Sequence, residues 1–164
     1  MNLSKRIELL SKLKTYIAEN PLEWQEQKQI AFIENAWFTP EFIDLAVHNI
    51  TEYFLDIEKL ASWTQQYHLP EKNYKPQKVG VVMAGNIPLV GFHDFLCVFI
   101  TGNIAVLKLS SKDKVLIKHI VSKLVEWDSE VNNYIILKEI INNCDAYIAT
   151  GSNNSAGYFE YYFK

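Results

Sequence analysis

Apolar side chains in the first 69 residues recur three or four positions apart, which is the spacing of an amphipathic helix. Leu3, Ile7, Leu10 and Ile17 mark a first helix that Pro21 closes. Three more helices are predicted over residues 22–38, 40–54 and 57–67. Their one-sided apolar positions are Ile30, Ile33 and Trp37 in the second helix, Phe42, Ile43, Ala46, Ile50 and Phe54 in the third, and Leu60, Trp63 and Tyr67 in the fourth. We expect this segment to form a helical layer that covers another part of the fold.

The pattern changes after a polar stretch, residues 69–78, that contains two prolines. Short runs rich in β-branched residues then alternate with amphipathic segments. Strands are predicted over residues 78–84, 104–109 and 146–149, and helices over residues 88–100 and 134–141 and after Ser110-Ser111, the last with Ile117, Val121, Leu124 and Val125 on one face. This alternation indicates βαβ units. The predicted fold class is α/β: a partial, Rossmann-like open parallel sheet preceded by a helical N-terminal segment.

Four residues are expected to cap the beginning or end of a helix. Gly102 stands where a C-cap glycine belongs, and Ser110 and Ser111 can cap the helix that follows them. Asn86 directly precedes Ile87-Pro88, so its side chain is placed to cap a helix there. The alternative for Asn86 is a role as a hydrogen-bond donor to a developing oxyanion.

Three strands make a thin sheet, and residues 158–164 have the pattern of an amphipathic helix without a stop signal. A doubly wound sheet normally continues beyond such a helix. We therefore expect this sequence to be the front part of a longer protein.

Composition and charge narrow the range of functions. The 164 residues are 49% hydrophobic, which is enough for a proper core, and 16 basic residues face 19 acidic ones. A net charge of -3 argues against broad electrostatic binding to nucleic acid. The longest apolar segment, residues 87–100, is too short to span a bilayer, and no signal peptide is recognisable. We predict a soluble, cytoplasmic protein with no nucleic-acid partner and no membrane span.

The cysteines and histidines show no metal-ligand spacing, so no metal site is predicted. Cys97 lies in an apolar run and is interpreted as a small buried hydrophobic residue, with a reactive thiol as the alternative. His93 falls within the helix predicted after Pro88 and is expected to be buried with a satisfied hydrogen bond. Cys144 precedes the third predicted strand.

Polar residues follow each of the three predicted strands. Asn86 follows the first strand, Lys108 ends the second, and Thr150-Gly151-Ser152 follows the third. No standard phosphate loop and no Gly-x-Gly-x-x-Gly motif follows the first strand. Each residue alone has an ordinary structural explanation, such as a solvated lysine at a strand end. Their shared position at the carboxyl ends of parallel strands, where open α/β sheets bind ligands, predicts a ligand site.

Three segments in this order resemble the aldehyde dehydrogenase superfamily: residues 85–88 (GNIP), 102–110 (GNIAVLKLS) and 145–154 (DAYIATGSNN). Within that superfamily they are most similar to the LuxC-like acyl-CoA reductases, the fatty-acyl reductases of bacterial luminescence and their relatives. The resemblance covers residues 78–164. The pattern of the chain divides it into a helical segment over residues 1–69 and an α/β part over residues 70–164, and the resemblance implies that the α/β part is a partial NAD(P)-binding domain.

The resemblance also implies roles for individual residues. Asn86 matches the asparagine that stabilises the oxyanion, and Lys108 matches the lysine that contacts the adenosine ribose. Gly151 and Ser152 match the Gly-Ser at the cofactor-binding helix, with Ser152 near the pyrophosphate. Thr150, directly before them at the end of the third predicted strand, is expected to belong to the same cofactor site. In the family, a cysteine in a later domain accepts the acyl group of an acyl-CoA or acyl thioester, and hydride from NADPH releases the aldehyde.

Neither cysteine of this sequence occupies a position that matches the catalytic one. We therefore expect the protein of this sequence alone to be inactive. Family members commonly associate, so the resemblance also implies that the full-length enzyme is a homo-oligomer. The competing hypothesis is a non-catalytic α/β module that binds a nucleotide or a partner.

The choice of cofactor rests on Ser111. In many NAD-preferring members of the superfamily, an acidic residue lies three positions after the ribose-contacting lysine, which is Lys108 here. The corresponding residue is the uncharged Ser111, and Lys112 and Lys114 follow it. An acid at this place repels the 2′-phosphate of NADP, so its absence predicts NADP(H) as the cofactor. The alternative is that Ser111 only caps the next helix.

Overall fold

The computed structural model describes residues 1–150, so the predictions for Gly151 and Ser152 lie outside the described residues. Four α-helices and one π-helix form the N-terminal part: α1 (Leu3–Glu19), α2 (Leu22–Glu34), α3 (Pro40–Asn49), η1 (Ile50–Phe54) and α4 (Ile57–Gln66). The remainder contains β1 (Lys78–Val82), α5 (Phe92–Ile100), β2 (Ile104–Lys108), α6 (Val115–Trp127), the 3-10 helix η2 (Ser129–Asn133), β3 (Ile135–Leu137) and β4 (Ala146–Ala149).

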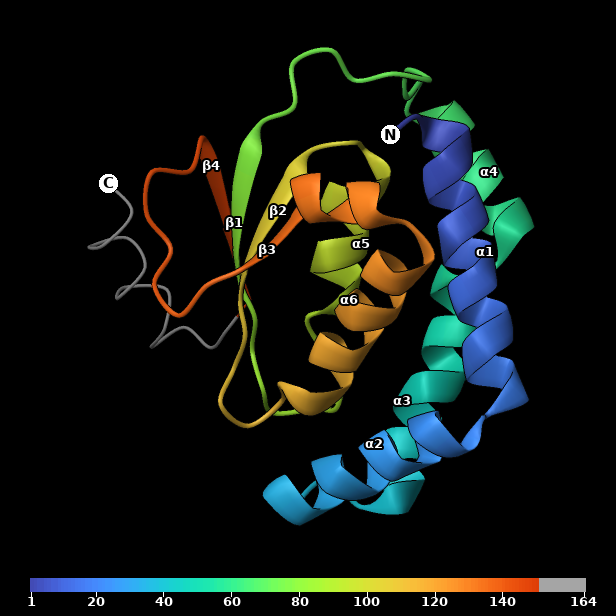
Figure 1. Ribbon diagram of the computed structural model, residues 1–164, viewed down its shortest axis with the longest axis vertical. Coiled ribbons are helices and arrows are strands. Elements are labelled where there is room, and N and C mark those ends of the chain that lie inside the picture. The colour runs from blue at the N-terminus through green and yellow to red at the C-terminus, as the bar shows by residue number, and fades with distance from the viewer. Residues whose placement is uncertain (151–164) are drawn as a thin grey trace.

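The four strands form one parallel sheet in the order β3-β2-β1-β4 (Figure 1). The chain therefore moves outward from β1 to β2 and β3, and then returns to the other side of β1 to form β4. Such a reversal of direction is the mark of a doubly wound sheet. The predicted fold class, a parallel α/β sheet after a helical segment, is confirmed.

The described residues stack in three layers (Figure 1). Helices α5 and α6 cover one face of the sheet, and the N-terminal helices lie on the far side of α5 and α6. Most side chains of α5 are buried, among them Phe92, Phe95 and Phe99, whereas His93 is exposed. One continuous apolar core joins the sheet, α5, α6 and the N-terminal helices. No helix among the described residues is both long and apolar enough to cross a membrane.

The first helix is confirmed, but the second is shorter than predicted. Helix α2 ends at Glu34, and Asn35 leaves the helical conformation with a φ of −145°. Its buried side chains are Trp24 and Ala31, whereas Ile33 and Trp37 are 70% and 88% exposed. Apolar spacing alone indicated the wrong face, because Trp37 lies in the turn before Pro40 rather than in the helix.

The predicted third helix is two elements. Helix α3 begins with Pro40 in its first turn, as expected, and continues into the π-helix η1. The wider π-turn changes which side chains face inward. Ile43 and Ile50 are buried as predicted, while Phe42 is exposed.

The fourth predicted helix is confirmed as α4 over Ile57–Gln66, with Leu60 buried. Tyr67 follows its last residue and is exposed.

Two helices predicted in the second half of the chain differ from those in the structure. Residues 134–141 form no helix: Ile135–Leu137 is strand β3, because these three apolar residues pair with the buried strand β2. The helix expected to begin at Pro88 begins only at Phe92, since residues 86–91 form turns in which Leu89 has a φ of 59°.

The cap predicted for Gly102 is confirmed, and the serine cap is not. Gly102 has a φ of 74° and donates its N–H to the carbonyl of Phe99 at the end of α5. Helix α6 begins at Val115, too far along the chain for Ser110 or Ser111 to cap. The Ser110 hydroxyl accepts the N–H of Lys112 within the preceding turn instead.

A buried guanidinium joins helix α1 of the N-terminal part to the end of helix α5. Arg6 on α1 is fully buried, and its Nε and Nη1 atoms donate to the carbonyls of Ile100 at 3.0 Å and Met1 at 2.8 Å. Burial lowers the pKa of Arg6 from its usual value, but a guanidinium remains charged at any ordinary pH. Gly102 lies against this group, so that a Cβ there would approach the Arg6 Nη1 to 2.9 Å.

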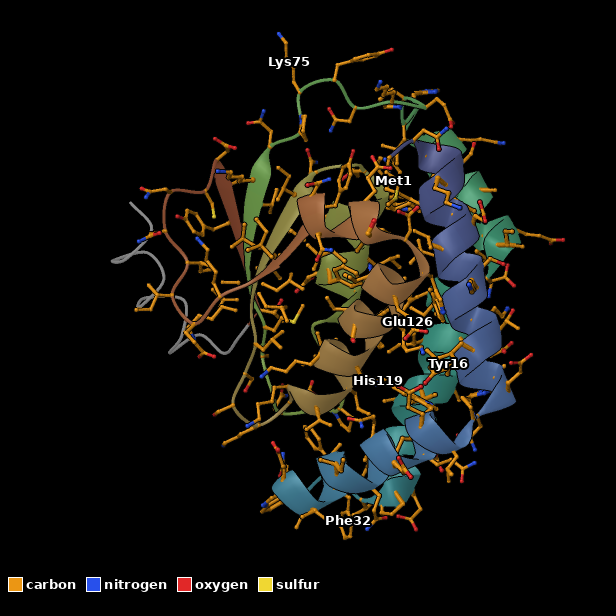
Figure 2. All side chains as sticks on the ribbon, viewed as in Figure 1. Met1, Tyr16, Phe32, Lys75, His119 and Glu126 are labelled. Carbon is orange, nitrogen blue, oxygen red and sulfur yellow. The ribbon has the colours of Figure 1, made fainter. Side chains whose placement is uncertain are left out.

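A second polar contact ties α1 to α6 (Figure 2). The Tyr16 hydroxyl lies 2.7 Å from Nε2 of His119, which is almost fully buried. Burial lowers the pKa of His119, so this imidazole is neutral near pH 7. On the same helix, Lys123 donates to carboxylates of Glu23 at 3.3 Å and Glu126 at 2.7 Å.

We predict that Gly102→Ala lowers the free energy of unfolding by about 1–2 kcal/mol, because a left-handed backbone is costly for a residue with a Cβ. The contact with Arg6 adds to this loss. Urea unfolding measures the change. Gly102→Asn is the control, since asparagine tolerates the left-handed region but carries the same Cβ. Equal losses for alanine and asparagine assign the cost to the Arg6 contact, and an unchanged stability for both would contradict the prediction.

Candidate functional site

Parallel pairing brings the predicted site residues to one edge of the sheet. In the register, Val82 at the end of β1 stands opposite Lys108 on β2 and Ala149 on β4. Asn86 follows β1 by four residues, and Thr150 directly follows β4. The structure therefore places Asn86, Lys108 and Thr150 at the carboxyl edge that the sequence predicted for them. Ser111 lies three residues beyond β2 at the same edge.

The sheet changes direction between β1 and β4. From β1 the chain proceeds through β2 to β3, whereas β4 lies on the opposite side of β1. In doubly wound sheets, ligands bind at the carboxyl ends of the strands where the direction changes. Asn86 follows β1 and Thr150 follows β4, the two strands on either side of this point.

Asn86 lies in an exposed turn and caps no helix of the described chain. The N-cap residue of α5 is Gly91, five positions further on, and it makes no side-chain cap. The capping role predicted for Asn86 is therefore wrong, because the helix does not begin where Pro88 allows it to. Its amide remains exposed at the edge of the sheet.

A buried carboxylate holds the loop that carries Asn86. Asp113, which is 5% exposed, accepts hydrogen bonds from the backbone N–H groups of Leu89 and Val90. It thereby joins the loop after β1 to the loop after β2 at Leu89, whose backbone is left-handed. Sequence reasoning missed Asp113, because nothing in the pattern of residues 110–114 distinguishes it from a solvated surface acid.

Burial dominates the ionisation of Asp113. Desolvation raises the pKa of this carboxyl from 3.8 to about 7, although the two backbone hydrogen bonds act in the opposite direction. Near neutral pH, the folded protein therefore holds this group partly protonated beneath the Asn86 loop.

A lysine-lined cleft occupies the carboxyl ends of β2 and β3. Its walls contain two hydroxyls and one carboxylate besides the apolar ends of the strands, and four lysines: Lys108, Lys114, Lys118 and Lys138. Lys114 pairs with Glu34 at 3.2 Å. Within residues 1–150, the other three lysines of the cleft have no carboxylate partner, so the cleft carries a surplus of positive charge. Of these lysines, sequence analysis singled out only Lys108 for the site. Lys118 and Lys138 reach the cleft from α6 and from the loop after β3, so their sequence positions did not point to it.

Thr150 is held by the first turn of α5. Its hydroxyl donates to Asp94 at 2.6 Å, and the other oxygen of Asp94 lies 3.8 Å from Nδ1 of His93. The end of β4 is thus linked to the helix that follows the Asn86 loop.

The cysteines lie away from this edge. Cys144 precedes β4 and so stands at the amino end of the sheet. Cys97 is half-buried on α5, with its sulfur 3.7 Å from Nε2 of His93. The buried environment predicted for His93 is wrong, since its side chain is 56% exposed at the surface of α5. No group of three or more potential metal ligands occurs among residues 1–150.

Comparison with known families gives one match. The model of a family described as acyl-CoA reductase (LuxC) matches residues 50–159, about two thirds of the chain. The chain belongs to this LuxC acyl-CoA reductase family, as the three sequence motifs predicted. Comparisons with curated proteins and with solved structures found no match.

We predict that Asp113 makes the protein less stable as the pH rises. The unfolded chain ionises Asp113 near pH 3.8, whereas the folded state retains the proton up to about pH 7. The folded state therefore binds the extra proton between these values, and the free energy of unfolding falls by about 3 kcal/mol from pH 4 to pH 7 through this group. Asp113→Asn keeps a hydrogen-bond acceptor but cannot ionise.

Urea unfolding of both proteins across this pH range tests the prediction. The difference between wild type and Asp113→Asn isolates the single carboxyl from all other titrating groups. The variant is expected to be the more stable protein at pH 7 and to lose the advantage at pH 4. A difference that does not change with pH would refute the role of Asp113.

Proposed function

We propose that this chain carries the NADPH-binding part of an acyl-CoA reductase that forms an aldehyde through an enzyme-bound thioester. In this proposal, residues 70–164 are the cofactor-binding domain and residues 1–69 its helical cover. The observation that carries the proposal is the lysine-lined cleft at the carboxyl ends of β2 and β3. Membership of the LuxC family supplies the reaction class.

The side chains in the cleft suit a phosphorylated ribose. Lys108 at the end of β2 is the proposed contact of the adenosine ribose, and Ser111 is the proposed neighbour of the 2′-phosphate. Lys118 and Lys138, which have no carboxylate partner among the described residues, supply positive charge for that phosphate. Lysine binds phosphate as a point charge, and serine donates a hydrogen bond to it.

The cleft contains one carboxylate, that of Glu139, and it belongs to the loop after β3. Ser111, which carries a hydroxyl, occupies the position three residues after Lys108. An acid at this position would repel a 2′-phosphate. This difference in charge favours NADP(H) over NAD(H). Thr150, together with Gly151 and Ser152, is proposed to contact the pyrophosphate from the adjacent β4 edge.

Asn86 is the proposed oxyanion donor. Its carboxamide lies at the sheet edge and is free of any helix cap, so its N–H groups are available to an oxygen that becomes negative when a thiol or hydride adds to a carbonyl. The cofactor supplies the hydride when it is bound. Asp113 supports this step indirectly, because it fixes the loop that positions Asn86.

Neither Cys97 nor Cys144 is placed to form the thioester. Cys144 stands at the opposite edge of the sheet, and burial raises the pKa of the Cys97 thiol. We propose that the nucleophilic cysteine comes from another part of the enzyme and that residues 1–164 alone are inactive. Thioester chemistry needs a free thiol, which fits a reducing cytoplasm.

Self-association is also proposed. Large apolar side chains of the α2 and α3 region, among them Ile33, Trp37 and Phe42, are more than half exposed. Exposed apolar surface of this kind promotes association between copies.

We predict that Ser111→Glu weakens NADPH binding by the full-length protein about tenfold or more, because the new carboxylate repels the 2′-phosphate. NADH binding is expected to change less. Titration of each cofactor against both proteins measures the effect. Ser129→Glu is the matched control, since it adds the same charge at an exposed serine after α6, outside the cleft. Equal losses for the two cofactors, or a wild-type protein that ignores NADPH, would refute the assignment.

We predict that Asn86→Ala lowers turnover of the full-length enzyme by about 10²-fold or more, the scale for the loss of one oxyanion donor. The unfolding free energy is expected to change little, because Asn86 caps no described helix. Asn86→Asp should lose as much activity, since a carboxylate cannot donate. Steady-state kinetics and thermal melting are measured on the same preparations. Normal turnover in either variant would exclude Asn86 from the chemistry.

A further inference from the structure

A second cavity lies on the other side of α5 from the sheet, between this helix and the N-terminal helices η1 and α4. Its walls are mainly apolar, with Phe54 and Trp63 on one side and Leu96 and Ile100 of α5 on the other. The cavity encloses about 140 Å³, whereas one water molecule needs only about 10–15 Å³. It is therefore large enough for a part of a small organic ligand.

Two polar groups of the cavity wall contact each other. The Cys97 sulfur lies 3.7 Å from Nε2 of His93, one helical turn earlier on α5. The ring of His93 packs on Phe54, with 5.1 Å between the centroids. Because this thiol and this imidazole are already partnered, an alkyl chain can lie against them at a smaller desolvation cost than against unpartnered polar groups.

The backbone on one wall is irregular. Residues 50–54 form the π-helix η1, which supplies Tyr53 and Phe54 to the cavity. A π-turn costs helix stability and frequently occurs at functional sites. In this protein the wider turn directs two consecutive aromatic residues into the lining of one cavity.

A single cation stands at the rim. Lys59 lines the cavity, its Nζ atom donates to the carbonyl of Glu52 at 2.9 Å, and it lies 4.8 Å from the ring centre of Tyr53. Within residues 1–150, no carboxylate pairs with Lys59, in contrast to Lys14 and Lys28, which form ion pairs with Asp56 and Asp44. The positive charge at the rim is thus held in place and remains available to an anion.

We propose that this cavity binds a medium-chain fatty carboxylate, with the alkyl chain between η1, α4 and α5 and the carboxylate at Lys59. An apolar interior with one unpaired cation at its mouth matches a ligand with an apolar body and one anionic end. The site is separate from the cofactor cleft, and the proposal does not depend on the proposed reductase function.

Protection of Cys97 from a thiol reagent tests whether the cavity is occupied. Octanoate is added to the full chain carrying Cys144→Ser, below the concentration at which octanoate self-associates, and the rate of alkylation by iodoacetamide is measured. Octanoate is expected to slow the alkylation of Cys97 at least tenfold. In the matched protein with Cys97→Ser, the alkylation of Cys144 should not change. An unchanged rate at Cys97 would overturn the proposal.

A pair of lysine variants tests the anionic end. Lys59→Gln is expected to weaken octanoate about tenfold in the same protection assay and to leave protection by 1-octanol unchanged. Lys72→Gln is the control, because Lys72 also lies over a tyrosine ring, at 5.3 Å from that of Tyr74, but outside the cavity. Equal effects of the two variants, or octanol protection as strong as that of octanoate in the wild type, would overturn the assignment of a carboxylate.

Discussion

The architecture depends on a buried charge. Arg6 is wholly removed from solvent, and its guanidinium reaches two carbonyls, one at the start of the chain and one at the end of α5. A buried cation is costly unless it is hydrogen-bonded. The Nε and Nη1 atoms of Arg6 are satisfied in this way, whereas Nη2 is buried without a hydrogen-bond partner among the described residues. The bond to Ile100 and the close approach of Gly102 tie the start of α1 to the end of α5. The cavity lies on the same side of α5, where η1 and α4 pack against this helix.

A second buried ionisable group lies at the opposite end of the sheet, and this one is an acid instead of a base. Asp113 is a buried carboxylate that collects the N–H groups of Leu89 and Val90, and it holds the Asn86 loop in a conformation that asparagine itself does not stabilise. The proposed chemistry thus needs a carboxyl that touches no substrate. Leu89, which has a strained left-handed backbone, lies in the loop between Asn86 and α5. Backbone strain of this kind is common where a loop is preorganised for function.

Helix α5 is the element that both proposed sites share. Its first turn reaches Thr150 at the cofactor edge through Asp94, while His93 and Cys97 line the cavity on its other side. His93 and Asp94 are adjacent in sequence, and Nδ1 of His93 lies 3.8 Å from Oδ1 of Asp94. Two consecutive residues of one helix therefore connect the two proposed sites.

The sequence by itself determined the fold class, the existence of most elements and the site edge. Alternating β-branched and amphipathic segments specify a parallel sheet, and parallel pairing then forces Asn86, Lys108 and Thr150 to one edge whatever the details. Local patterns were misleading where tertiary contacts outweigh them: Ile135–Leu137 is a strand because β2 offers it a partner, and α5 begins late because Asp113 holds Leu89 and Val90 in turns. The burial of Arg6 and Asp113, the lysines that converge from α6 and the β3 loop, and the cavity at Cys97 were decided only by tertiary structure. Each of them depends on groups far apart in sequence, and a one-dimensional pattern carries no information about which distant groups remove a charge from water.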